Sequence, residues 1–258
     1  MLEARSPDER RQARRKPEGA GRRVIEVALD TASEVAGVAL TEEGALVAEV
    51  TWHTRQNHSR ELLPTLDWLL SHQGLTKDDI AAIYVCLGPG SYAGLRVGVS
   101  TAKALAYALG VPIAGVGRLA ADAYGIAIDG GPRVVAVHAA GRAELAWAAY
   151  HREDGRLLEP IPPRLGRQET LLEDLRPGDV VCGDLGPEIL AALAARGVSQ
   201  ARPALARVLA VAAIGRGRLL AGDTDDPDSL VPLYLREPAI GPQPPRPEAP
   251  PEPAEGPR

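Results

Sequence analysis

A glycine-rich segment that leads into a helix is the first place in this sequence where chemistry could occur. It reads GPGSYAGLRVGVSTAKALAYA, from Gly88 to Ala108. Such a turn can present free backbone N–H groups and the positive end of the helix dipole to a phosphate. The segment is not a P-loop, because no Gly-Lys-Ser or Gly-Lys-Thr follows at the required spacing. Phosphate binding is therefore one of two explanations for these glycines.

The second explanation is close packing along the helix. Small residues recur at every fourth position and so share one helix edge: Gly94, Gly98, Ala102 and Ala106. Few side chains stand on that edge, so another backbone can approach closely, and ridges of residues four apart favour such packing. The neighbour is either the protein's own sheet or a helix of another subunit, and periodicity does not separate the two.

A second candidate phosphate loop reads LDTAS at positions 29–33. An acidic residue ending a first strand, followed by a tight polar hairpin, resembles the opening of the sugar-kinase, heat-shock-chaperone and actin superfold. In that superfold the hairpin wraps around nucleotide phosphates, and the close approach favours glycine where this chain has Ala32. The second phosphate loop, expected near 182–186, departs from the pattern too. We interpret 29–33 as a vestigial loop, in which Asp30 is a relic or a structural hydrogen-bond acceptor. Its residues are Asp30, Thr31 and Ser33.

The remaining reactive residue types form no recognisable catalytic or metal-binding pattern. The histidines are His53, His58, His72, His138 and His151. A zinc-peptidase helix needs H-E-x-x-H, but Leu62 stands four residues after His58, which fits a polar role at a helix start. Ser91 lacks the G-x-S-x-G elbow of hydrolases. Cys86 and Cys182 lie in apolar runs without zinc-site spacing, so we expect both in the core. The sequence predicts no metal site and no catalytic residue.

Composition limits what the chain could bind. The 258 residues carry a net charge of −5, whereas a protein that grips nucleic acid alone usually has a basic face. Positive charge gathers in residues 1–22, which we expect to be a disordered basic tail, either solvated or touching RNA. This leader has no apolar core, and no apolar run approaches the roughly 20 residues of a membrane helix, so we expect a cytoplasmic protein. Residues 237–258 are rich in proline and glutamate and are predicted to be disordered.

Between these tails, hydrophobic periodicity predicts alternating strands and helices. Short β-branched runs separated by turn residues indicate an antiparallel meander, and leucines at helical spacing follow it. Thr76 and Asp79 resemble a capping box before a buried strand. The order β-β-β-α-β-α-β-α indicates a mixed sheet. The expected strands are 24–30, 35–40, 46–53, 80–88 and 111–117, and the expected helices are 59–73, 92–109 and 118–128.

The second half has shorter elements and looks like a smaller lobe that partly repeats the first. Strands joined by turns are expected over 133–158, with further strands at 179–183 and 230–236. The helices are expected at 169–176, 187–196 and 204–221. We place the first lobe at 23–112 and the reduced second lobe at 113–236, and the last helix could pack back on the first lobe.

Taken in order, five of these segments resemble the TsaB (YeaZ) family. The matching stretches are ALDTASEVAGVAL, HSRELLPTLDWLL, GPGSYAGLRVGVSTAKALA, VPIAGVGRLA and LVPLYLRE. The third is the most specific, and together they span most of 24–236. The resemblance implies an α/β protein with the two-lobed actin-like, sugar-kinase and heat-shock-chaperone (ASKHA) superfold and a reduced second lobe.

The resemblance also implies a function. A chain that resembles TsaB is expected to be a non-catalytic dimerisation and activating subunit for TsaD. TsaD transfers a threonylcarbamoyl group to the adenosine next to the anticodon of tRNA. It implies a TsaD-like partner, cooperation with a TsaE-like ATPase, tRNA contact through the complex, and self-association when TsaD is absent. ATP and metal are expected on the partner subunits, with a nucleotide at the subunit interface as an option, and no cofactor on this chain.

Helices near 59–73 and 92–109 pair with the partner in the family, so we expect the small-residue edge to serve partly as an intermolecular face. The expected interface residues are Arg60, Leu63, Tyr92, Gly94, Leu95, Arg96, Gly98, Val99, Ala102 and Lys103. The sequence departs from the family at VHAAGRAEL, where His138 and Ala140 replace the usual Asp and Arg. Two alternatives stay open: an ATP-binding transferase or kinase of the same superfold acting alone, and a peptidase, against which the missing metal helix argues.

Overall fold

A five-stranded mixed sheet forms the centre of the first lobe. The computed structural model describes residues 23–55, 57–183, 185–202 and 206–235, and the two predicted tails lie outside this part of the chain. Three strands make an antiparallel meander, as predicted, and two more continue it in parallel, in the order β3-β2-β1-β4-β5. The strands are β1 (Ile25–Asp30), β2 (Val35–Glu42), β3 (Ala45–His53), β4 (Ile80–Gly88) and β5 (Ile113–Gly117).

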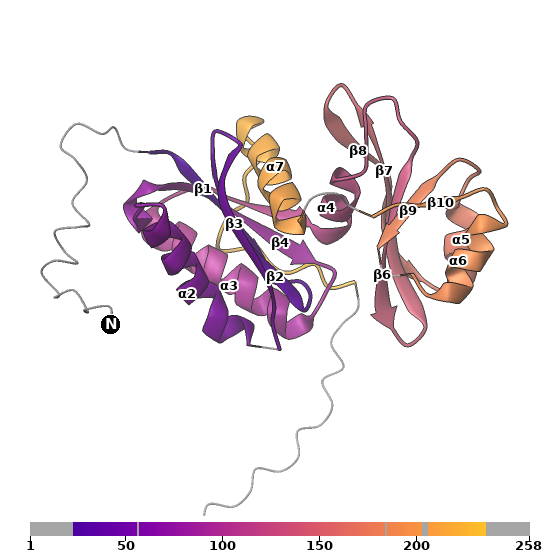
Figure 1. The fold of residues 1–258 in the computed structure, drawn as a ribbon, viewed down its shortest axis with the longest axis horizontal. Coiled ribbons are helices and arrows are strands. Elements are labelled where there is room, and N and C mark those ends of the chain that lie inside the picture. The colour runs from indigo at the N-terminus through magenta and orange to yellow at the C-terminus, as the bar shows by residue number, and fades with distance from the viewer. Residues whose placement is uncertain (1–22, 56, 184, 203–205, 236–258) are drawn as a thin grey trace, which may run out of the picture.

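Helices cover both faces of this sheet (Figure 1). The helices α2 (His58–His72) and α3 (Tyr92–Leu109) pack on one face, and α7 (Arg207–Leu220) packs on the other. Alternate residues of a strand point to opposite faces. Val27 therefore joins the core beneath α2 and α3, whereas Ala28 joins the core beneath α7. Because both faces of the central strands are buried, β1 and β4 read as nearly continuous apolar runs.

Local signals in the sequence set several of the element boundaries. Ser91 caps α3, since its Oγ accepts a hydrogen bond from the backbone N–H of Gly94 at 3.3 Å. The same helix ends at Gly110, which adopts the left-handed conformation that glycine tolerates. The predicted capping box is present, and Asp79 accepts from the backbone N–H of Thr76 at 2.9 Å. It opens a short 3-10 helix, η1 (Lys77–Asp79), just before β4.

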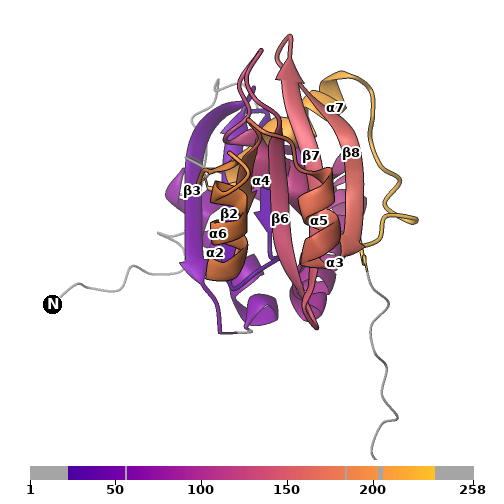
Figure 2. The same ribbon diagram turned by 90° about the vertical axis from the view of Figure 1, so that its right-hand side faces the viewer.

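The second lobe contains another five-stranded sheet, in the order β10-β9-β6-β7-β8. Figure 2 shows two helices in front of this sheet and α4 (Arg118–Tyr124) behind it, on the side of the first lobe. The predicted α/β class with two lobes is therefore confirmed, and the sheet of the second lobe is mixed as well. The strands are β6 (Val134–Gly141), β7 (Glu144–Glu153), β8 (Arg156–Gly166), β9 (Val180–Gly183) and β10 (Ser199–Gln200), and the helices in front are α5 (Gln168–Asp174) and α6 (Pro187–Ala194).

Two predictions about organisation are wrong. The lobe boundary at 112/113 divides β5 from β4, yet β5 pairs with β4 in the first sheet, so the boundary falls after it. The strand expected at 230–236 is irregular over 230–235. Pro232 has no N–H to donate to a ladder, and Leu233 donates one backbone hydrogen bond to Leu87. No helix of the described residues is long and apolar enough to cross a membrane.

Candidate functional site

The loop after β1, which the sequence offered as a phosphate loop, is bonded within the chain. Asp30 is buried, and its Oδ1 accepts from the N–H of Ala32 at 3.0 Å. The hydroxyl of Thr31 donates to the backbone oxygen of Gly94 at 2.8 Å. Ser33 Oγ lies 3.2 Å from Nη1 of Arg207 and donates to the backbone oxygen of Val35. The three predicted loop residues thus lie together, and each side chain already has a partner in the chain.

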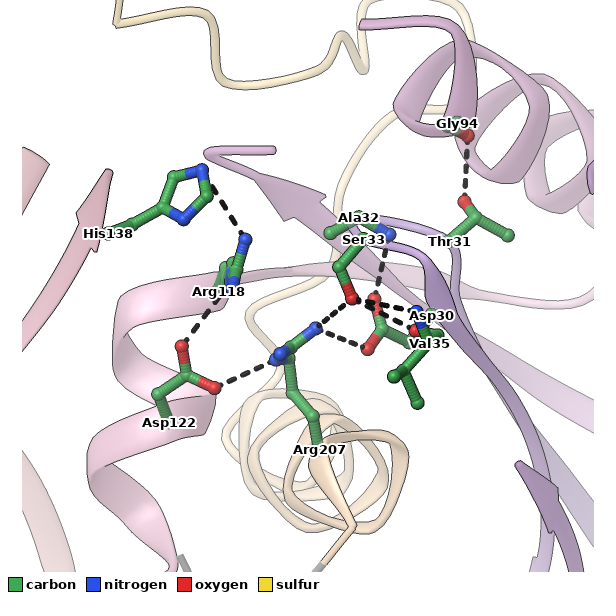
Figure 3. A network of polar contacts seen from close by, with 10 residues as sticks. All are labelled: Asp30, Thr31, Ala32, Ser33, Val35, Gly94, Arg118, Asp122, His138 and Arg207. Atoms are coloured by element: carbon green, nitrogen blue, oxygen red, sulfur yellow. Dashed lines mark hydrogen bonds and ion pairs between the residues drawn. The ribbon is translucent and has the colours of Figure 1, made fainter. Parts of the chain in front are cut away.

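Arg207 is the centre of a buried ionic network (Figure 3). Its Nη1 donates to Asp30 Oδ2 at 3.0 Å, and its Nε donates to Asp122 Oδ1 at 2.8 Å. Asp122 also pairs with Arg118 at 3.4 Å, and Arg118 Nη1 lies 3.4 Å from Nε2 of His138. Since α7, β1, α4 and β6 supply these residues, the network joins the first lobe to the second.

Electrostatics keep this network charged. Burial lowers the pKa of Arg207, but the carboxylates of Asp30 and Asp122 outweigh that effect and raise the pKa above its ordinary value. A buried ion pair is tolerated when both partners are compensated in this way. The guanidinium therefore stays positive and is paired with Asp30 Oδ2.

The small-residue edge of α3 packs against the loop after β1. All four members of this edge, Gly94, Gly98, Ala102 and Ala106, are buried. A Cβ atom added at Gly98 would overlap Oγ1 of Thr31, and one added at Gly94 would overlap the backbone oxygen of Thr31. These glycines are required because the loop lies directly on the helix. Five expected interface residues are therefore in the chain's own core, and the partner-face prediction is wrong for them: Gly94, Leu95, Gly98, Val99 and Ala102.

The other expected interface residues lie on the outer side of α2 and α3. Leu63 is 49% exposed and Tyr92 is 42% exposed, and both arginines of the set, Arg60 and Arg96, are exposed as well. Arg96 Nη1 donates to the hydroxyl of Tyr92 at 3.1 Å, so these two side chains support each other. Lys103 is turned to its own chain, because its Nζ donates to the backbone oxygen of Leu230 at 2.9 Å.

A shallow groove of about 340 Å³ runs between α2 and α3 on this outer side. Leu62, Leu63 and Val97 give it apolar walls, and Arg96 contributes the only charged side chain among its lining residues. The other lining residues are Ser59, Ser100 and Thr101. An apolar groove with one cation at its edge suits an apolar side chain that has an acidic neighbour.

His58 and both cysteines are buried in the chain. Within the described part of the chain, no group of three or more His, Cys, Asp or Glu side chains is arranged to hold a metal ion. Both cysteines are buried, as predicted, and burial raises the pKa of Cys182 to about 12. His58 is buried at the start of α2 beside Gly94, and burial lowers its pKa.

Comparison with known proteins agrees with this architecture. A family model described as TsaD, tRNA N6-adenosine threonylcarbamoyltransferase, matches residues 46–185. The chain is 32% identical over 154 residues to the tRNA threonylcarbamoyladenosine biosynthesis protein TsaB of Bacillus subtilis, covering 59% of this chain and 66% of that protein. An uncharacterised protein of Mycobacterium tuberculosis H37Rv is 33% identical over 218 residues, covering 84% of this chain and 93% of the relative. The chain belongs to the TsaB (YeaZ) family.

A solved structure of YeaZ from Pseudomonas aeruginosa has the same fold. It matches with a TM-score of 0.68 at 24% identity, over 81% of this chain and 100% of that one. In this TsaB-family chain, the position where the family pattern has Asp carries His138, which is half-buried and lies beside Arg118 in the network.

Sequence reasoning missed the cations of the network. Arg207 stands 177 positions from Asp30, and Arg118 and Asp122 sit in a short apolar helix. The sequence offered one signal for this network. Arg118 and Asp122 carry opposite charges four residues apart, a spacing at which side chains can pair along a helix. Neither residue indicated that Asp122 would pair with Arg207, 85 positions away on α7.

Proposed function

We propose that this chain is the non-catalytic, activating subunit of a complex that transfers a threonylcarbamoyl group to adenosine in tRNA. The family supports the pathway, since the Bacillus subtilis relative is named as a tRNA threonylcarbamoyladenosine biosynthesis protein. The matching family model carries the description of the transferase TsaD, which supports a TsaD-like protein of the same superfold as the catalytic partner. A TsaE-like ATPase, tRNA bound through the complex and a cytoplasmic location complete the proposal.

The closed loop after β1 is the observation that carries the non-catalytic part. A kinase or transferase of this superfold needs backbone N–H groups that face a phosphate. Here the N–H of Ala32 is bonded to Asp30, and Arg207 is paired with the same carboxylate. ATP and its metal are therefore assigned to the partner subunits.

The outer side of α2 and α3 is the proposed docking face for the TsaD-like partner. The face consists of Arg60, Leu63, Tyr92 and Arg96 around the 340 Å³ groove. Exposed leucine and tyrosine supply apolar contact area, and buried aromatic and arginine anchors supply much of the binding energy in protein interfaces. We expect a partner helix that places an apolar side chain in the groove and an acidic residue opposite Arg96. Without TsaD, the same face would support self-association.

Co-expression with a TsaD-like protein tests the partnership, and calorimetry tests the absence of a nucleotide site. The chain should co-purify with the partner in stoichiometric amount. Titration of the lone chain with Mg-ATP should show no stoichiometric binding. Failure to co-purify would remove the docking proposal, and tight binding of ATP to the lone chain would favour the alternative of an enzyme acting alone.

A further inference from the structure

A second groove lies on the other side of α2, between that helix and the edge strand β3. Its volume is about 460 Å³. It is separate from the proposed docking groove, since it opens toward the sheet edge rather than toward α3. Its lining residues are Val50, Trp52, Arg60, Glu61, Pro64, Thr65 and Trp68.

This groove gathers two of the chain's three tryptophans. The whole sequence has no phenylalanine and only 3% aromatic residues. Trp68 is nevertheless 55% exposed, and its ring stacks on His72 with centroids 5.1 Å apart. Trp52 is half-buried, and its Nε1–H donates to Glu61 Oε2 at 2.9 Å, which fixes the indole. Two oriented indoles beside a proline are a preformed apolar surface.

The last described residues of the chain, 230–235, run along α3 toward the end at which α2 and α3 begin. Lys103 holds the backbone oxygen of Leu230 beside the middle of α3, and further on the ring of Tyr234 packs against that of Tyr92 at the start of α3, with centroids 5.0 Å apart. The start of α2 is adjacent, because His58 touches the position of Gly94. The chain therefore runs toward the helix starts, and Arg60, in the first turn of α2, lines the tryptophan groove.

The residues that follow match what such a groove binds. The sequence 242–247 reads PQPPRP, with prolines spaced as P-x-x-P and one arginine. P-x-x-P segments bind aromatic-lined grooves in the polyproline II conformation. The seven residues 236–242 span about 20 Å when extended at about 3.1 Å per residue. The path leads from α3 past α2, and that reach is about twice the spacing of roughly 8–10 Å between packed helices.

The charges of the segment 242–247 and of the groove are complementary. A hydrogen bond from Trp52, together with one from Thr54, lowers the pKa of Glu61, so its carboxylate is ionised at neutral pH. Arg246 is the one basic residue within 242–247. Arginine pairs well with carboxylates, which gives the segment a direction in the groove. Arg60, which lines the groove, has the charge to pair with the glutamate at 248.

We propose that the proline-rich segment 242–247 binds in the groove between α2 and β3 of its own chain. Its prolines pack on Trp52 and Trp68, and Arg246 pairs with Glu61. This inference goes beyond the proposed function and is tested on the lone chain. Arg60 belongs both to the proposed docking face and to this groove.

Fluorine NMR of the full chain labelled with 5-fluorotryptophan tests the inference. Three resonances are expected, and Trp147 serves as an internal reference because it is fully buried in the second lobe. Combining Pro244→Ser, Pro245→Ser and Pro247→Ser should shift the resonances of Trp52 and Trp68 and leave that of Trp147 unchanged. The matched control combines Pro250→Ser, Pro251→Ser and Pro253→Ser and should leave all three resonances in place.

Single substitutions at Arg246 test the contribution of its charge separately from that of the prolines. Arg246→Glu should move the same two resonances toward their positions in the triple variant, and Arg246→Lys should move them less. Unchanged resonances of Trp52 and Trp68 in the triple variant would overturn the proposal. A shift that depends on protein concentration would also overturn it, because the segment would then occupy the groove of another copy.

Discussion

At the scale of single residues, Arg207 binds the loop after β1, which the sequence suggested as a phosphate loop, to the rest of the chain. One guanidinium pairs with two buried carboxylates from different elements, Asp30 after β1 and Asp122 on α4. A buried carboxylate without a partner is costly, since the cost of removing it from water is no longer offset. The arginine is therefore a structural centre that compensates both carboxylates.

Replacing Arg207 should destabilise the folded chain strongly. Arg207→Met keeps most of the side chain's length but leaves two buried carboxylates without their cation, which should cost about 3–5 kcal/mol. Urea unfolding followed by circular dichroism measures the free energy of unfolding. Arg207→Lys retains a positive charge and should lose less. A change below about 1 kcal/mol for Arg207→Met would show that the network is not holding the lobes.

Gly98 gives a second prediction at this scale. A methyl group at this position overlaps Oγ1 of Thr31, so Gly98→Ala should destabilise the isolated chain by about 1–3 kcal/mol through overpacking. Ala104→Ser, at an exposed position of the same helix, is the control and should stay within about 0.5 kcal/mol of the wild type. If Gly98→Ala left stability intact while abolishing partner binding, the edge would face another subunit after all.

At the scale of elements, α2 and α3 each have an inner and an outer side with different tasks. Leucines such as Leu62 and Leu66 anchor α2 on the sheet, while Leu63 faces outward. Helical periodicity predicted both helices, because their inner residues recur at helical spacing. Periodicity could not identify the neighbour of the small-residue edge of α3, since an edge with few side chains can pack closely against any backbone. Only the fold showed that the neighbour is the loop at Thr31.

The outer side yields a prediction about binding. Leu63→Glu places a charge in the apolar groove and should weaken binding to a TsaD-like partner by about 2 kcal/mol or more, roughly thirtyfold in Kd. Calorimetric titration with the purified partner measures this Kd. Leu220→Glu changes another exposed leucine, at the end of α7 on the opposite side of the sheet, and should bind normally. Equal weakening by both variants would show that the effect is not local to the groove.

At the scale of the whole molecule, the two sheets and their connections limit what a sequence can reveal. The meander and the alternation of strands and helices were predictable, because local periodicity encodes them. The lobe boundary was not, since the pairing of β5 with β4 depends on the tertiary fold. The segment at 230–235 reads as a strand because its residues are apolar, yet Pro232 interrupts it. The network around Arg207 depends on residues far apart in the chain.

Reconstituted tRNA modification tests the central claim most directly. A TsaD-like subunit with its ATPase, substrates and tRNA is assayed for threonylcarbamoyl transfer to adenosine in three reactions, which contain this chain, its Leu63→Glu variant or neither. We predict transfer with the wild-type chain, and loss of most activity both without the chain and with the variant at limiting concentration. Full activity without the chain, or transfer by this chain without a TsaD-like subunit, would contradict the account.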